Sequence, residues 1–387
     1  MSAAPLEALP LDVLRERSST KWRSYGPDVL PMFVAETDFP LAPAITRALT
    51  RAVELGDTGY TPPNPGVREA FVGFAERKWD WRVDPSHVFW TADVMMGVVE
   101  ILRRVIAPGD RVVVMPPVYP PFYDTVAEAG GVVERVPLRF DGAGWDIDIE
   151  AVGRALAAGA RAVLLCNPHN PTGTTHSAAA LAALADIAER FGAAVVSDEI
   201  HAPLTYSRGG FTPFLTASAS AARVGYAVTS ASKTFNLAGL KCAVMIGGGE
   251  AQAHLLRSLP SEVEWRTGLF GALANVAAFS PESQGWLDGL LAALEINRSL
   301  LADLLAEHLP AARYLPPQAG YLAWVDVSAY GWGDDPARRI LKEAKVALHH
   351  GPLFGSEGIG HVRINFGCAP DVLRDAVQRL GALAASS

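Results

Sequence analysis

The sequence has few cysteines and no long apolar run. Three cysteines occur among 387 residues, and their spacing suits neither a metal site nor paired disulfides, so we expect Cys166, Cys242 and Cys368 to be buried free thiols and expect no metal centre. No stretch approaches the roughly 18 uninterrupted apolar residues of a membrane-spanning helix. The first residues lack the basic segment and apolar run of a signal peptide, so we expect a cytoplasmic protein.

Basic residues are also scarce relative to acidic ones. Lysine and arginine total 33 against 41 aspartates and glutamates, which gives a formal net charge of −8. This balance disfavours nucleic acids and anionic membranes as partners. Half of the residues are hydrophobic and 19% are charged, so the chain can bury a large core, in roughly two or three domains, rather than remain disordered.

Apolar runs alternate with helical patterns between about residues 66 and 249. Near-continuous apolar runs are typical of strands whose sheet is covered on both faces, and their alternation with helices predicts an α/β fold with a mostly parallel central sheet. One of the helices is predicted over residues 177–191, with Ser177 as its N-cap. The predicted strands are 111–115, 161–166, 193–197, 225–228 and 242–246.

A different pattern follows this alternating region. Its predicted elements are a long helix over 284–308, strands near 320–327 and 361–366, and a closing helix over 370–384. We therefore expect a large domain over residues 46–285 and a smaller α+β domain over residues 286–387. The N-terminal segment, residues 1–45, is expected to pack with the small domain.

Three polar residues each follow one of the predicted strands. They are Asn170, Asp198 and Lys233. The carboxyl ends of parallel strands meet at one edge of a sheet, where open α/β sheets bind ligands. A lysine there can hold an aldehyde cofactor as a Schiff base, and a carboxylate can keep the cofactor's ring nitrogen protonated. Singly these residues are ordinary surface, cap or loop residues, but their order and placement together predict a site for pyridoxal 5′-phosphate (PLP).

With these residues the chain, from about residue 31 to its C-terminus, resembles the fold-type I PLP-dependent enzymes of the class I/II aminotransferase superfamily. The resemblance implies that the large domain binds PLP, that Lys233 carries the cofactor and that Asp198 pairs with its ring nitrogen. It also implies that Asn170 binds the phenolic oxygen and that Tyr119, in a Pro-Pro-Val-Tyr sequence, stacks on the ring. For His201 two roles stay open, a contact with the phenolic oxygen or the lining of the pocket.

The same resemblance assigns the cofactor's phosphate. Ser230 and Lys241 stand where the family places a hydroxyl and a basic residue, and the helix opened by Val94 and Met95 turns its backbone N–H groups to the phosphate. Lys241 supplies a point charge where many relatives have the fork of an arginine. Asp93 stands where a small residue is usual, so we expect its carboxylate to turn away and only its backbone to take part.

The resemblance further implies a subunit partner and an amino-acid substrate. Tyr60 matches a tyrosine that crosses a subunit interface to the partner's phosphate, which implies a homodimer with shared active sites. Arg363 matches the arginine that binds the substrate α-carboxylate, for which its fork of donors is suited. Asn170 and Tyr321 are also expected to take part in substrate binding.

Several segments resemble the MalY/PatB group of cystathionine β-lyases in particular. These segments are Thr20-Lys-Trp and residues 31–39, 166–173, 197–201 and 321–326. The resemblance implies a C–S β-lyase that cleaves L-cystathionine or another L-cysteine S-conjugate to a thiol, pyruvate and ammonia. Glu36 and Thr37 depart from the Asp-Met common in this group, which leaves the preferred substrate side chain open.

Two other functions stay open. The same residues serve equally well in an aminotransferase that moves an amino group from an L-amino acid to a 2-oxo acid. A non-catalytic regulatory or ligand-sensing module is the other alternative, which the presence of Lys233 and the acidic balance disfavour. Formation of keto acid and free ammonia without a 2-oxo acid acceptor separates the lyase from the aminotransferase.

Overall fold

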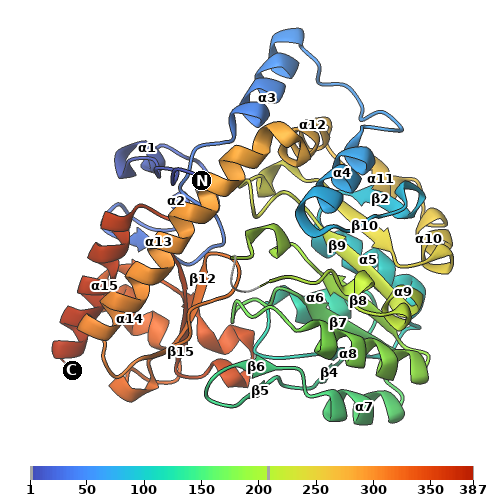
Figure 1. The fold of residues 1–387 in the computed structure, drawn as a ribbon. Helices are drawn as coiled ribbons and strands as arrows, with labels where there is room; N and C mark the ends of the chain where they lie inside the picture. Colours follow the sequence, from blue (N-terminus) through green and yellow to red (C-terminus); the bar gives the residue numbers. More distant parts are fainter. Residues whose placement is uncertain (1–2, 207–209, 387) are drawn as a thin grey trace.

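A seven-stranded sheet forms the centre of the computed structural model, which describes residues 3–206 and 210–386 (Figure 1). In spatial order its strands are β2 (Val88–Thr91), β10 (Ala243–Gly247), β9 (Gly225–Thr229), β8 (Ala194–Asp198), β7 (Ala162–Cys166), β3 (Arg111–Val114) and β4 (Val132–Arg135). The five strands from β9 to β4 run parallel, whereas β10 is antiparallel to both of its neighbours. The predicted α/β fold with a mostly parallel sheet is therefore confirmed.

The five predicted strands correspond to β3 and β7–β10, with ends that differ by at most one residue. The two strands at the sheet edges were not predicted. β4 is partly exposed along its length, and Glu134 and Arg135 interrupt its apolar pattern. β2 is buried along its length, and Val88, Phe89 and Trp90 are apolar, but sequence analysis did not select it.

Both faces of the sheet are buried, as the near-continuous apolar runs predict. Successive strand residues point to opposite faces, so Val113 packs in one core cluster while its neighbours Val112 and Val114 pack in the other. One cluster includes residues of α5 (Val94–Val105), α6 (Pro121–Glu128) and α10 (Glu250–Arg257). The other includes residues of α4 (Val67–Trp79), α7 (Ile149–Ala157), α8 (Ala178–Arg190) and α12 (Leu269–Phe279).

The predicted helices are present. α8 begins after Ser177, whose Oγ accepts a hydrogen bond from the N–H of Ala180 at 3.1 Å, which confirms the predicted N-cap. The long helix α13 (Gln284–His308) has the predicted bounds and packs against the closing helix α15 (Pro370–Ala385), as Figure 1 shows. The remaining helices are α1 (Leu11–Arg15), α2 (Thr20–Arg23), α3 (Pro43–Leu55), α9 (Ala219–Val224), α11 (Glu262–Trp265) and α14 (Pro336–Ala344).

A second, antiparallel sheet lies in the C-terminal part of the chain. Its strands, in spatial order, are β11 (Arg313–Tyr314), β12 (Leu322–Asp326), β15 (His361–Asn365) and β14 (His349–His350). Two short pairs complete the strands, β5 (Arg139–Phe140) with β6 (Trp145–Asp146), and β1 (Leu30–Pro31) with β13 (Val346–Ala347). The β1–β13 pair is parallel and joins the N-terminal segment to the C-terminal part of the chain.

The predicted burial of the three cysteines is confirmed. Cys166, Cys242 and Cys368 are buried free thiols, and burial raises the pKa of each thiol. Over residues 3–206 and 210–386, no helix combines the length and the hydropathy that crossing a bilayer requires.

Candidate active site

A cavity of about 580 Å³ lies at the carboxyl edge of the central sheet. The adjacent strands β3, β7, β8 and β9 end at this edge, and the loops that follow them bring together residues far apart in sequence. Arg363 reaches the same cavity from β15 of the smaller sheet. The predicted site residues on the cavity wall are Val94, Met95, Tyr119, Asn170, Asp198, His201, Lys233, Lys241 and Arg363.

Lys233 and Asp198 are ionisable groups that burial shifts toward their neutral forms. Burial, and next the positive charge of Arg363, lowers the pKa of Lys233 to about 8. Burial raises the pKa of Asp198 to about 7, against the opposing effects of the Ile200 N–H, which donates to Asp198 Oδ1 at 3.1 Å, and of Lys233. An amine whose pKa is near 8 can accept and return protons near neutral pH.

Arg363 is buried in the cavity wall, and one of its guanidinium nitrogens, Nε, has no hydrogen-bond partner in the described residues. Its Nη1 donates to Asn170 Oδ1 at 2.9 Å, its Nη2 donates to the carbonyl of Phe33 at 2.9 Å, and the guanidinium lies 5.0 Å from the centre of the Phe354 ring. Burial lowers the pKa of Arg363 to about 10, so the side chain remains charged at neutral pH. A held, charged guanidinium is suited to a carboxylate.

The expectation that the Asp93 carboxylate turns away is wrong. Asp93 Oδ1 accepts from the N–H of Met96 at 2.9 Å and caps α5, while Oδ2 accepts from Lys241 Nζ at 2.9 Å. The physical reason is that a carboxylate satisfies the free N–H groups of a helix start and attracts a nearby ammonium. The helix start and Lys241, both predicted to serve a phosphate, therefore already share an anionic side chain.

The structure also differs from the expectation for Ser230. Ser230 is buried, its Oγ donates to the carbonyl of Cys242 at 2.6 Å, and the same oxygen accepts from the N–H of Ser232 at 3.0 Å. These bonds fix the turn that leads to Lys233. Ser232, not Ser230, lines the cavity.

Tyr119 and His201 lie on the cavity wall in neutral forms. Tyr119 packs edge-on against Phe122 with 6.2 Å between ring centroids, and burial raises its pKa. Burial lowers the pKa of His201 to about 3, so its imidazole is uncharged near neutral pH. His201 Nδ1 has no hydrogen-bond partner in the part of the chain that the structure describes, so both roles expected for it stay predictions.

Besides Ser230, two predicted residues are not on the cavity wall. Tyr321 is fully buried, and its hydroxyl lies 3.0 Å from the carbonyl of Ala35 and 3.3 Å from that of Lys233, so it serves the backbone around the site. Tyr60 is 91% exposed and lies beside Trp265, with 6.3 Å between ring centroids. Its predicted role in a partner's site stays a prediction.

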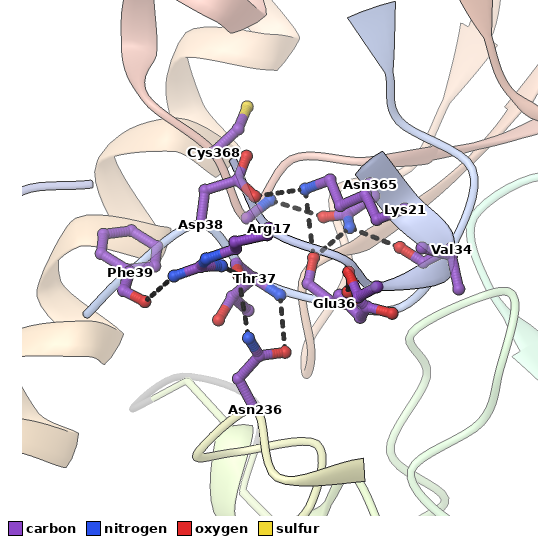
Figure 2. Close-up of polar contacts among 12 residues, drawn as sticks. Arg17, Lys21, Val34, Glu36, Thr37, Asp38, Phe39, Asn236, Asn365 and Cys368 are labelled. Carbon is purple, nitrogen blue, oxygen red and sulfur yellow. Dashed lines mark hydrogen bonds and ion pairs between the residues drawn. The ribbon is translucent and has the colours of Figure 1, made fainter. Parts of the chain in front are cut away.

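Residues 33–39, which we call the strap, lie within the segment that resembles the MalY/PatB group, but sequence analysis missed the part that their backbone takes in the site. The Ala35 carbonyl accepts from Lys233 Nζ at 3.3 Å, so the strap contacts the predicted base directly. Figure 2 shows the polar side chains that fix the strap, among them Lys21, Asn236 and Asn365. No residue pattern identifies a functional backbone carbonyl, although Glu36 had marked this segment as unusual.

His349 was missed as well. It lines the cavity from β14, opposite Arg363 in the pairing with β15, and burial lowers the pKa of its imidazole to about 3. Its Nδ1 lacks a hydrogen-bond partner among the described residues. The sequence around it, Leu348-His-His350, carries no signal that would have singled it out.

Comparison with known proteins finds relatives that match nearly the whole chain. The chain is 36% identical over 375 residues to cystathionine beta-lyase PatB of Bacillus subtilis, which covers 94% of this chain and 96% of PatB. It is 33% identical over 373 residues to a cystathionine beta-lyase of Corynebacterium glutamicum, with 96% and 98% of the two chains covered. The crystal structure of the PLP-bound C-S lyase from Staphylococcus hominis matches with a TM-score of 0.89 at 25% identity, over 98% of each chain. The family model of aminotransferase class I and II matches residues 29–380, and this chain is a member of that family.

Proposed function

We propose that the chain is a PLP-dependent C–S β-lyase that cleaves L-cystathionine or another L-cysteine S-conjugate to a thiol, pyruvate and ammonia. The observation that carries the proposal is that the amine of Lys233, the carboxylate of Asp198 and the guanidinium of Arg363 line one cavity. The relatives favour a lyase over an aminotransferase, because PatB and the Corynebacterium glutamicum relative are named cystathionine beta-lyases and the Staphylococcus hominis structure is that of a C-S lyase.

The ring end of PLP fits the side chains on the cavity wall. Lys233 offers an amine for the aldehyde, and Asp198 offers a carboxylate for the ring nitrogen. Asn170 offers an amide for the phenolic oxygen, and Tyr119 offers an aromatic face for the ring. His201 Nδ1 and Arg363 Nε are buried and have no hydrogen-bond partner in the described residues. Buried polar atoms usually have a partner, so both nitrogens also suit a polar ligand.

The phosphate end of PLP also finds hydrogen-bond donors at the cavity, but the carboxylate of Asp93 places a negative charge beside them. The backbone N–H groups at the start of α5, together with Lys241, offer donors to an anion. Asp93 already accepts from both, so a phosphate has to share or replace those bonds. We therefore infer that Asp93 weakens the phosphate site rather than supporting it.

The chain's own residues account for the steps of a β-elimination. PLP, when bound, draws electrons from the Cα of an amino-acid substrate. Arg363 binds the α-carboxylate, with Asn170 orienting the guanidinium through their 2.9 Å hydrogen bond. Lys233 removes the Cα proton and returns a proton to the sulfur as the carbon–sulfur bond breaks. Asp198 holds a proton at the ring nitrogen.

We further propose a cytoplasmic homodimer with shared active sites. The support is the exposed aromatic pair Tyr60 and Trp265, whose exposed fractions are 91% and 69%, because large exposed aromatic groups are typical of subunit interfaces. The proposed division of the chain is a PLP-binding domain over residues 46–285, a small domain over 286–387 and an N-terminal segment, 1–45, that packs with the small domain.

The proposal is tested by asking whether activity requires a 2-oxo acid as the acceptor of the amino group. We expect PLP-loaded protein to keep releasing ammonia from L-cystathionine over many turnovers with no 2-oxo acid present, and an added 2-oxo acid to leave the rate unchanged. Lys233→Ala, loaded with PLP, is the control and is expected to be inactive although folded. Conversion of the cofactor to its amine form without release of ammonia, reversed by addition of a 2-oxo acid, would instead make the chain an aminotransferase.

A further inference from the structure

The strap reaches two functional side chains through its backbone carbonyls. Ala35 accepts from Lys233 Nζ at 3.3 Å, and Phe33 accepts from Arg363 Nη2 at 2.9 Å. Lys233 follows β9 of the large sheet, whereas Arg363 lies on β15 of the small sheet. The position of the strap therefore sets the distance and direction of a hydrogen-bond acceptor for both groups at once.

Asn236 fixes the strap from the Lys233 side. Its Oδ1 accepts from the N–H of Thr37 at 3.3 Å, and its Nδ2 donates to the carbonyl of Thr37 at 3.2 Å, as Figure 2 shows. One carboxamide thus bonds both backbone polar groups of a single strap residue. We call these two hydrogen bonds between Asn236 and Thr37 the clasp. Asn236 lies three positions after Lys233 in the same loop, so the clasp links that loop directly to the strap.

The backbone of Asn236 is in an uncommon conformation. Its φ is 57°, in the left-handed region that residues other than glycine rarely adopt, although asparagine tolerates it best. Such a conformation persists where the surroundings fix it, and it is frequent at functional sites. Here the conformation coincides with the two-point clasp on Thr37.

We propose that Asn236 is a positioning residue for the lyase reaction, which acts by holding the strap so that its Ala35 and Phe33 carbonyls orient Lys233 and Arg363. The proposal rests on the proposed function, because Lys233 and Arg363 have their roles only there. Asn236 itself contacts neither substrate nor cofactor in this account. Its effect on the chemistry passes through the backbone of the strap.

The clasp has a consequence for the protonation of Lys233. The Ala35 carbonyl favours the charged amine because it accepts a hydrogen bond from it. The charged and titratable groups that face Lys233 are Arg363, Lys241 and His201, and the carboxylates Glu36 and Asp198. Glu36 belongs to the strap and also favours the charged amine. A displaced strap therefore lowers the pKa of Lys233 further.

Capture of PLP by the cofactor-free protein tests this, because only the neutral amine of Lys233 reacts with the aldehyde. We measure the absorbance change on adding PLP between pH 6 and pH 10, for wild type, Asn236→Ala and Asn236→Gly. Glycine accepts the left-handed backbone without strain and lacks the carboxamide, so this variant removes the clasp alone. We expect the midpoint of capture to move to lower pH by about 0.5 unit or more in both variants, and the KM for L-cystathionine to rise about tenfold.

Asn297→Ala is the matched control. Asn297 is also a buried carboxamide that donates to two backbone carbonyls, those of Phe366 at 2.9 Å and Cys368 at 2.7 Å, and within the described residues its side chain makes no hydrogen bond to the strap. This variant is expected to lower the melting temperature and leave the pH midpoint of capture in place. If wild type captures PLP but both Asn236 variants keep the wild-type pH midpoint and KM, the inference is overturned while the proposed function stands. A wild-type chain that captures no PLP would overturn the proposed function, and the inference with it.

Discussion

Arg363 and Lys233 are two cationic side chains in one cavity whose lowered pKa values lie at different distances from neutral pH. Burial lowers the pKa of Arg363 to about 10 and that of Lys233 to about 8. Near neutral pH the guanidinium keeps its charge, while the amine readily gives up its proton. The first group is therefore suited to holding a carboxylate and the second to moving a proton.

Replacing Arg363 tests this division of roles. We expect Arg363→Ala to raise the KM for L-cystathionine by about 10- to 100-fold, because charge-assisted hydrogen bonds to the carboxylate are worth roughly 1.5–3 kcal/mol. Steady-state kinetics measure the change. Arg338→Ala is the control, since Arg338 is 80% exposed and pairs only with Asp335 within the described residues. Equal KM values for wild type and Arg363→Ala would show that the carboxylate binds elsewhere.

The placement of Lys233, Asp198 and Asn170 at the cavity could be predicted because each follows a strand of one parallel sheet, and strand order alone brings them together. The side-chain contacts of Ser230 and Asp93 could not be predicted from the sequence. Which of two nearby serines lines a cavity depends on one turn, and whether an aspartate points toward a helix start depends on a lysine far along the chain. Sequence spacing carries neither fact.

At the scale of elements, the start of α5 combines a helix cap with an ion pair. Asp93 caps the helix through Met96 and pairs with Lys241, whose side chain is 57% exposed. The cap stabilises α5, whereas the negative charge opposes a bound phosphate. Stability of the helix and affinity for the cofactor therefore favour different side chains at this position.

Asp93→Ser separates the two effects. Serine keeps the N-cap and removes the charge, so we expect PLP to bind about tenfold more tightly, which corresponds to about 1.4 kcal/mol. Absorbance titration of cofactor-free protein gives the dissociation constant. The control is Asp148→Ser, because Asp148 caps α7 in the same way through Ala151 at 2.9 Å and does not line the cavity. Weaker binding by Asp93→Ser would show that the carboxylate supports the cofactor site.

The strap depends on a buried ion pair as well as on Asn236. Lys21 Nζ lies 2.6 Å from Asp38 Oδ1, and both side chains are almost fully buried, at 1% and 2% exposure. Burial raises the pKa of Asp38, while Lys21 opposes that shift. Since charges buried together depend on each other, the loss of one partner is far more costly than the loss of an exposed pair.

We expect Lys21→Met to lower the free energy of unfolding by roughly 3–5 kcal/mol, because it leaves the Asp38 carboxylate buried without a partner. Urea denaturation measures the change. Arg47→Ala, which breaks the exposed pair with Glu282 at 64% and 69% exposure, is expected to cost no more than about 1 kcal/mol. Similar losses in the two variants would contradict the view that the buried pair anchors the strap.

The elements themselves could be predicted to different degrees. α8 has a clear N-cap in Ser177, and the predicted bounds of both α8 and α13 are close to those observed. The strap has no regular structure, and its partners Asn236 and Arg363 are about 200 and 330 positions away. Contacts between residues so far apart in sequence arise from the packing of the whole chain, so no local sequence pattern predicts them.

At the scale of the whole molecule, the proposed dimer makes a prediction about mixed subunits. Lys233→Ala and Tyr60→Ala are each expected to be nearly inactive, through loss of the base and of the partner's phosphate contact. If sites are shared, a heterodimer of the two variants has one site with both native residues. Random exchange of subunits is then expected to restore about a quarter of wild-type activity. An inactive mixture, with heterodimers verified by native mass spectrometry, would show that each subunit works alone.

The overall architecture could be predicted in outline, because alternating apolar runs and helices permit few arrangements other than a covered parallel sheet. The antiparallel insertion of β10 between β9 and β2 could not, since an apolar run does not state the direction of a strand. The contact between the N-terminal segment and the C-terminal part, seen in the β1–β13 pair, involves strands of two residues each. Strands this short leave no periodic pattern in the sequence.

The central claim is that this chain breaks a carbon–sulfur bond by β-elimination. The most direct test incubates the PLP-loaded protein with excess L-cystathionine and no 2-oxo acid, and quantifies pyruvate, ammonia and free thiol in the same samples over many turnovers. The account predicts that the three products appear in equal amounts and at equal rates. Absence of thiol and pyruvate, with conversion of the cofactor to its amine form that a 2-oxo acid reverses, would contradict the claim and leave an aminotransferase.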